Sequence, residues 1–293
     1  MAKKFSKPEL SRRINGDLPT KSITIDETPK RRLDMILLEK YPQYSRASIQ
    51  KLIKDGRAFV NNDKCQRANQ LVAEDDEPNC KLEVPKKSAA KRPSVIYEDD
   101  NVIVFNKPCG MLSIKKGAYL EESAIDDFGE IVHRLDRDTS GVIIVAKNLK
   151  TKSLLQRQFA ERKSHKTYYA VVVGHPKQNH AIINIPLTRN LKRPTTFIAD
   201  PNGREAITEY KVIAQNERFS LVELKPRTGR THQLRIHMAH IGTPILGDPV
   251  YNPKSPKADR MYLHAASLEI TIPNGKRVTF TAPLPDEFRN AVK

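Results

Sequence analysis

Apolar residues occur in short runs separated by polar turns along most of the chain after residue 93. Runs that are rich in Val, Ile and Tyr and bounded by Gly, Pro, Asn or Asp predict β-strands. The predicted strands cover residues 95–97, 102–105, 142–146, 166–173, 206–212, 219–224, 268–270 and 278–280. The four polar residues between the first two strands predict a hairpin.

Helical spacing of apolar residues is confined to a few segments. One predicted helix covers 33–37, and Ser45 is a good N-cap for a second that ends at a Gly soon afterwards. A third helix is predicted with Thr151 or Ser153 as its cap, and a fourth with Thr231 as its cap. Strands therefore outnumber helices in this sequence.

The second predicted helix has two distinct faces. Its core stripe consists of Ile49, Leu52 and Ile53. Arg46, Gln50 and Lys54 lie together on the outer face, and Arg57 begins the strand that follows. This row is either a solvated basic face or a surface that docks onto RNA phosphates.

Composition changes along the chain suggest four regions. Residues 1–32 are polar and basic without apolar periodicity, which predicts a flexible basic arm. Residues 33–84 form a compact small domain. Residues 85–93 begin and end with Pro and contain small and cationic residues, which predicts a basic linker. Residues 94–293 then form a large domain with ample volume for a core.

The chain has a formal net charge of +17 and a pI of about 9.7. Such an excess of cations predicts a polyanionic partner, nucleic acid above all, although a merely soluble basic protein is the simpler alternative. Cys65, Cys80 and Cys109 have spacings that fit neither a disulfide framework nor a zinc site, so we expect free thiols in a reducing, cytoplasmic compartment. No apolar run predicts a membrane span or a signal peptide.

Residues 131–141 combine charge with a turn before a buried strand. Asp136 lies between Arg134 and Arg137, and Thr139-Ser140-Gly141 supplies the turn. In an extended segment Arg134 and Asp136 share one face. A neighbouring guanidinium favours an ionised, nucleophilic carboxylate. The simpler alternative is a surface ion-pair cluster that only shapes the turn.

Two further segments carry candidate chemistry. Tyr168 lies in a predicted strand, where a tyrosine is more often part of the core than a stacking platform for a base. At the start of the fourth predicted helix, His232 and Arg235 share a face next to the core stripe. His232, His237 and His240 lack the i, i+4 pair that a helical metal site needs, so we expect no metal there. The basic, turn-rich stretch 184–204 predicts a substrate-facing loop.

Several of these segments resemble one enzyme family. Residues 133–141 read H-R-L-D-R-D-T-S-G and resemble the signature loop H-R-L-D-x-x-T-S-G of the RluA-type pseudouridine synthases. Residues 106–110, 166–170, 229–235 and 244–251 resemble further elements of that family. Residues 33–62 are similar to the alpha-L RNA-binding module of a ribosomal small-subunit protein.

The resemblance implies an α+β fold with a large mixed, mostly antiparallel sheet, preceded by the alpha-L RNA-binding domain. It implies an RNA pseudouridine synthase that isomerises uridine without a cofactor or metal. The partner implied is RNA, with large-subunit ribosomal RNA favoured and transfer RNA possible, and we expect a monomer.

The resemblance also assigns roles to residues. It implies that Asp136 is the nucleophile, that Tyr168 is the active-site tyrosine and that Arg235 pairs with Asp136. Arg134 would enter the RNA stack as the target uridine flips out. The substrate-binding residues expected are His133, Arg134, Arg137, Thr139, Arg230, His232 and Lys107. The RNA-docking residues expected are Arg46, Gln50, Lys54 and Arg57.

The sequence departs from the family pattern in residues 112–130, which lack the usual histidine and glycine-rich turn and are unusually short. Two other functional classes remain open at this point. Asp136 and Asp138 could hold Mg²⁺ in a nuclease or phosphotransferase, although such sites usually need further carboxylates. Alternatively, the protein could be a non-catalytic RNA binder.

Overall fold

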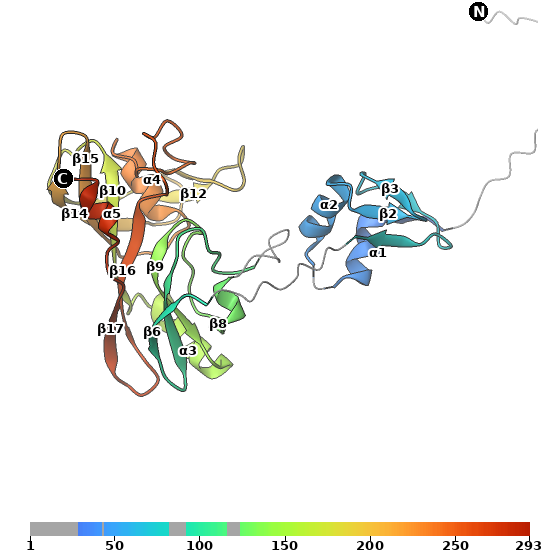
Figure 1. The fold of residues 1–293 in the computed structure, drawn as a ribbon, viewed down its shortest axis with the longest axis horizontal. Helices are drawn as coiled ribbons and strands as arrows, with labels where there is room; N and C mark the ends of the chain where they lie inside the picture. The colour runs from blue at the N-terminus through green and yellow to red at the C-terminus, as the bar shows by residue number, and fades with distance from the viewer. Residues whose placement is uncertain (1–28, 43, 82–91, 116–123) are drawn as a thin grey trace, which may run out of the picture. The chain divides into compact units, whose positions relative to one another are not determined.

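The computed structural model describes residues 29–42, 44–81, 92–115 and 124–293 (Figure 1). The described residues form two compact units, with the division after Lys81. The predicted arm falls largely within residues 1–28 and the predicted linker largely within residues 82–91, so both predictions lie mostly outside the described residues. Within the described ranges, no helix is long and apolar enough to cross a membrane.

The first unit consists of two helices and short strands. In chain order these are β1 (Arg31–Arg32), α1 (Leu33–Lys40), α2 (Arg46–Lys54), β2 (Ala58–Val60), β3 (Asp63–Cys65), β4 (Leu71–Val72) and β5 (Pro78–Cys80). Strands β3, β2 and β5 form an antiparallel sheet, and β1 pairs with β4. The Ser45 cap is confirmed, because its hydroxyl accepts a hydrogen bond from Ser48 N. Arg31 and Arg32, which the sequence analysis places at the end of the arm, pair with Val72 and Leu71 of β4.

A buried carboxylate, which we did not predict, organises this unit. Asp34 is fully buried and accepts hydrogen bonds from Arg32, Arg46 and Gln50 at 2.8 to 3.2 Å. The hydrogen bonds from Arg32, more than any other interaction, hold the pKa of Asp34 well below its ordinary value. Arg46 and Gln50 are thus partly committed to Asp34 rather than free on an outer face.

Replacement of Asp34 by Ala should lower the free energy of unfolding of this unit by about 1–3 kcal/mol, because it removes the hydrogen bonds that three side chains donate to a buried carboxylate. Since the pKa of Asp34 is lower in the folded than in the unfolded state, the unfolded state takes up the proton first. The contribution is therefore present above about pH 4 and is lost as the pH falls below that value. Denaturant titration at pH 7 and pH 3 checks this, with the exposed Asp55→Ala as a control. An equal loss in both variants would contradict it.

The second unit is built on a ten-stranded sheet. Its path runs β11-β14-β15-β10-β16-β9-β7-β6, with β17 paired to β16 and β8 paired to β9. The bounds are β6 (Ser94–Glu98), β7 (Val102–Lys107), β8 (Glu130–Ile131), β9 (Ser140–Ala146), β10 (His165–Val173), β11 (His180–Asn184), β14 (Ile207–Gln215), β15 (Phe219–Pro226), β16 (Leu263–Thr271) and β17 (Arg277–Thr281). Among the described strands of this sheet, β9 and β16 are the one pair that runs in parallel. The predicted α+β fold with a mixed, mostly antiparallel sheet is confirmed.

Beyond the sheet, the described part of this unit has three helices, a 3₁₀ turn and a small hairpin. They are η2 (Ile125–Asp127), α3 (Leu149–Ala160), β12 (Leu187–Arg189), β13 (Phe197–Ala199), α4 (Gln233–His240) and α5 (Asp286–Asn290). Two predicted caps are wrong. The cap of α3 is Asn148, whose side chain accepts from Thr151 N, so the helix starts before Thr151 and Ser153. Helix α4 follows His232, not Thr231, and His232 itself has a left-handed backbone with φ of 57°.

Strand β9 is buried on both faces, which explains its continuous apolar run. Val142 and Ile144 pack in one cluster with Leu155 of α3. Ile143 and Val145 pack in another cluster on the opposite face, together with Leu135 of the preceding loop. The loop that carries Asp136 therefore leads directly into the core of the sheet. A third cluster joins β10, β14 and β15 to α4 through Leu234 and Met238.

Gly141 permits the close parallel contact between β9 and β16. Its φ is 111°, and a Cβ atom there would lie 2.1 Å from the carbonyl oxygen of Ala265. Gly141→Ala should therefore lower the free energy of unfolding by at least about 3 kcal/mol, through both backbone strain and collision. Gly275→Ala is a matched control, because Gly275 also has positive φ but no atom within 4 Å of its added Cβ. Denaturant unfolding of the two variants measures the difference, and similar values would contradict the collision.

Candidate active site

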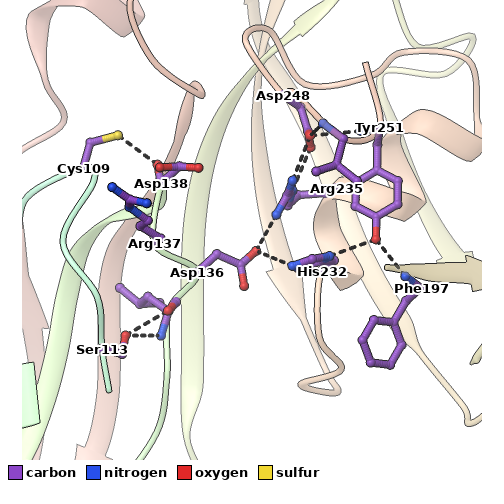
Figure 2. A network of polar contacts seen from close by, with 12 residues as sticks. Cys109, Ser113, Asp136, Arg137, Asp138, Phe197, His232, Arg235, Asp248 and Tyr251 are labelled. Carbon is purple, nitrogen blue, oxygen red and sulfur yellow. Dashed lines mark hydrogen bonds and ion pairs between the residues drawn. The ribbon is translucent and has the colours of Figure 1, made fainter. Parts of the chain in front are cut away.

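The loop before β9 is fixed by contacts that point Asp136 into a cleft. Leu135 is buried, its N–H donates to Ser113 Oγ at 3.1 Å, and the Ser113 hydroxyl donates to Leu135 O at 2.8 Å. Thr139 N donates to Asp136 O at 3.1 Å and closes the turn. Figure 2 shows this loop with Asp136 extended toward α4. The side chain of Asp136 remains 24% exposed, so it is held in place but accessible.

Lys107 holds the same loop in place by hydrogen bonds from inside the protein. This contrasts with its predicted role in substrate binding. Its side chain has no exposed surface, and Nζ donates to the carbonyl oxygens of Pro108, Met111 and Arg137 at 2.8 to 3.0 Å. Burial lowers the pKa of Lys107 to about 8, so it is still protonated at neutral pH. With its three hydrogen bonds inside the protein, Lys107 joins the 106–111 loop to the nucleophile loop.

Arg235 of α4 connects Asp136 to a second carboxylate. Arg235 Nη1 donates to Asp136 Oδ2 at 3.1 Å, while Nε and Nη2 donate to the two oxygens of Asp248 at 2.7 and 2.8 Å. A two-point contact of this kind fixes the plane of the guanidinium group. The predicted pairing of Arg235 with Asp136 is present, and Asp248, which carried no predicted role, holds the arginine in position.

Asp248 is nearly fully buried, with 1% of its side chain exposed. Burial alone would raise the pKa of Asp248, but hydrogen bonds and charge from Arg235 reverse this and lower it. Its Oδ1 also accepts from the backbone N–H groups of Val250 and Tyr251. The segment 244–251 matched the family in the sequence, and that match was the available signal for this residue.

His232 and Tyr251 form a second line of contacts to Asp136. His232 Nε2 lies 3.9 Å from Asp136 Oδ2, and His232 Nδ1 lies 2.8 Å from the Tyr251 hydroxyl. That hydroxyl also accepts a hydrogen bond from Phe197 N of β13 at 3.0 Å. Figure 2 shows the four residues in one continuous chain. Burial lowers the pKa of His232, and the charge of Asp136 opposes only part of this shift.

His133 lines the cleft but has a structural contact as well. Its ring stacks on Phe159 with 4.7 Å between centroids, and Nε2 accepts a hydrogen bond from Ile144 N at 3.2 Å. Burial, together with the charge of Lys166, lowers the pKa of His133 to about 3, so the ring is neutral. His133 therefore anchors the loop to β9, and substrate contact by this residue stays a prediction.

The cleft has a volume of about 830 Å³, which is large enough for a nucleotide. It brings together most of the predicted site residues: His133, Arg134, Asp136, Thr139, Tyr168, Arg230, His232 and Arg235. Arg137 lies outside the lining and is exposed, with Nε donating to Gly110 O. Lys166, two residues before Tyr168 on β10, also lines the cleft and was not predicted.

Tyr168 and Arg134 differ in their exposure. Burial, together with the charge of Asp136, raises the pKa of Tyr168, so its hydroxyl stays protonated. Arg134 is exposed at the rim.

Asp138 lies beside Cys109, apart from the Asp136 carboxylate, so the two acids do not converge (Figure 2). The described residues contain no group of three or more His, Cys, Asp or Glu side chains that could hold a metal ion.

Comparison with known proteins assigns both units. Residues 101–240 match the family model described as RNA pseudouridylate synthase, and residues 31–78 match the S4 domain. An uncharacterized RNA pseudouridine synthase of Aquifex aeolicus is 34% identical over 250 residues, covering 78% of this chain and 79% of that protein.

A second relative covers more of the chain. The ribosomal large subunit pseudouridine synthase D of Escherichia coli K12 is 31% identical over 289 residues and covers 88% of each protein. Among solved structures, human RNA pseudouridylate synthase domain containing 1 has a TM-score of 0.59 at 28% identity, covering 67% of this chain and 84% of that one. The chain thus belongs to the RNA pseudouridine synthase family of the RluA type, with an N-terminal S4 domain that binds RNA.

Proposed function

We propose that this enzyme converts specific uridines of large-subunit ribosomal RNA to pseudouridine, with Asp136 as the nucleophile. The observation that supports it is the position of the Asp136 carboxylate, which is accessible in the cleft and 3.1 Å from Arg235 Nη1. The guanidinium group orients the carboxylate through this hydrogen bond. The choice of ribosomal RNA rests on the E. coli relative, whose name states that substrate class.

The reaction moves the glycosidic bond from N1 to C5 of uracil and leaves the overall composition unchanged. Asp136 would start the cleavage of the bond between C1′ and N1 by attacking the sugar or the base, or by removing a sugar proton. The freed base then rotates and rejoins the sugar through C5, and the C5 proton is lost as N1 gains one. Each route uses the Asp136 carboxylate as an anion within reach of the bound nucleotide.

Access to the uridine requires that the base leaves the RNA stack. Flipping a base costs a few kcal/mol, which contacts to phosphates and replacement of the lost stacking offset. Arg134 and Tyr168 both line the cleft. In this proposal Arg134 would occupy the vacated position, and Tyr168 would stack on the flipped base. Thr139, Arg230 and His232 line the same cleft and would contact the nucleotide.

The S4 domain would supply a second RNA contact. Arg46 is 51% exposed although it pairs with Asp34, and Lys54 is exposed at the end of the same helix. Gln50 and Arg57 are half-buried beside them. The net charge of +17 fits a partner of high negative charge. We expect the protein to act as a monomer in the cytoplasm, without a cofactor.

Site-by-site pseudouridine mapping tests the proposal. Total RNA is compared from cells that express the wild-type chain, no chain, or Asp136→Asn. The expected result is that the same uridines of large-subunit ribosomal RNA lose the modification in the last two strains. Sites that vanish only from transfer RNA would overturn the ribosomal substrate. Sites retained with Asp136→Asn but lost without the chain would overturn the role of Asp136.

A further inference from the structure

The Tyr251 hydroxyl lies between two groups that together determine its orientation. Phe197 N–H can only donate, so it fills one acceptor position of the Tyr251 oxygen at 3.0 Å. Among the residues that the structure describes, the hydrogen of this hydroxyl has one acceptor within reach, His232 Nδ1 at 2.8 Å. The hydroxyl therefore accepts from the backbone of β13 and donates to the imidazole.

This orientation fixes the tautomer of His232. A neutral imidazole has one nitrogen that donates and one that accepts, and the hydrogen bond at one nitrogen determines which atom carries the proton. Because Nδ1 accepts from Tyr251, the proton resides on Nε2. Nε2 is the atom that faces the cleft, 3.9 Å from Asp136 Oδ2 (Figure 2).

We propose that Tyr251 is a positioning residue that holds His232 in the Nε2–H tautomer, so that His232 acts as a hydrogen-bond donor beside Asp136 and not as a base. The inference rests on the proposed role of Asp136 as the reacting carboxylate. At 3.9 Å, Nε2–H is too far for a full hydrogen bond to Asp136 and is available to a substrate atom placed between them. When the bond from C1′ to N1 breaks, negative charge develops on the uracil, and a fixed N–H donor stabilises it.

The contacts around Tyr251 allow the role of its hydroxyl to be tested separately from the role of its ring. The ring lies 5.1 Å from the Arg235 guanidinium, and it contacts the His232 ring edge-on with 5.5 Å between centroids. Tyr251→Phe keeps both ring contacts and removes only the hydrogen bonds of the hydroxyl. Tyr210 offers a matched control in the same unit, because it is a buried tyrosine whose hydroxyl donates to Gln178 O at 3.1 Å.

The direct test is ¹⁵N NMR of the histidine rings in the full-length protein at pH 7.5, with the His232 signals assigned by their loss in His232→Gln. Wild type and Tyr210→Phe should show His232 as the Nε2–H tautomer. Tyr251→Phe should show a mixture of tautomers. A wild-type protein with the proton on Nδ1, or an unchanged spectrum in Tyr251→Phe, would overturn the proposal. This readout needs no activity, so it remains informative even where Asp136 is not the nucleophile.

Kinetics on an RNA substrate distinguish a role of His232 as a hydrogen-bond donor from a role as a base. Loss of a residue that orients a functional side chain typically costs about 10- to 100-fold, so kcat of Tyr251→Phe should fall by about this factor, with KM within about twofold. His232→Gln can still donate from its amide and should retain at least about tenfold more activity than His232→Ala. Equal inactivity of His232→Gln and His232→Ala would overturn the role as a donor, and so would an unchanged kcat in Tyr251→Phe.

Discussion

Asp136→Asn is expected to reduce the rate of pseudouridine formation by at least about 10⁴-fold, the range seen when a nucleophile that acts together with its neighbours is removed. Asn has nearly the same shape but cannot attack as an anion, and it presents a weaker acceptor to Arg235 Nη1. The fold should persist, because the loop is held by Lys107 and Ser113 rather than by the Asp136 side chain. RNA affinity should stay within a few-fold, since phosphate contacts supply most of it.

Single-turnover assays with a transcript of a target helix measure this effect, and filter binding measures the affinity. The matched control is Asp138→Asn, an acid two residues away whose backbone carbonyl accepts from Cys109 Sγ (Figure 2) and whose side chain is not among the residues that line the cleft. It should retain activity within about tenfold, because its carboxylate does not face the cleft. Comparable losses in Asp136→Asn and Asp138→Asn would instead favour a paired-carboxylate site and contradict a single nucleophile.

Local sequence patterns predicted those helices and strands whose position depends mainly on neighbouring residues. The Ser45 cap, the hairpin of β6 and β7, and the buried run of β9 are all present as predicted. The cap of α3 was placed wrongly because Asn148, Thr151 and Ser153 are all competent caps, and only the packed position of the helix selects among them. The cap of α4 was missed because His232 takes a left-handed backbone, which non-Gly residues adopt rarely and which the helical spacing of apolar residues does not predict.

The active site depended more on tertiary structure. Arg235 meets Asp136 across 99 residues of sequence, and only the family resemblance suggested that pair. The structural roles of Asp34 and Asp248 were not predicted, because the sequence gives no sign that a particular carboxylate is buried. Both side chains are buried in the structure, where they accept hydrogen bonds from arginines. Lys107 was assigned to substrate binding only through the resemblance of residues 106–110 to the family, which gives no sign that its side chain is buried.

Asp248→Ala is expected to destabilise the second unit by roughly 3–5 kcal/mol, because it leaves the buried Arg235 with Asp136 as its only remaining carboxylate partner among the described residues. The Arg235 side chain is 6% exposed, so the loss of Asp248 leaves a charge that is largely shielded from bulk solvent. Asp248→Asn should cost less, about 2 kcal/mol, because an amide oxygen still accepts from the backbone N–H of Val250 and Tyr251.

The two Asp248 variants should distinguish the effect on activity from the effect on stability. In Asp248→Asn the fold persists, but the guanidinium loses its charged anchor and can turn toward Asp136, so kcat should fall by about 10- to 100-fold. Denaturant unfolding followed for the second unit gives the stability, and single-turnover assays give the rate. Asp259→Ala, an exposed acid in the same stretch, should change stability by less than about 0.5 kcal/mol. If Asp248→Asn were fully active, Asp248 would contribute only to stability, and Arg235 would hold Asp136 in place without it.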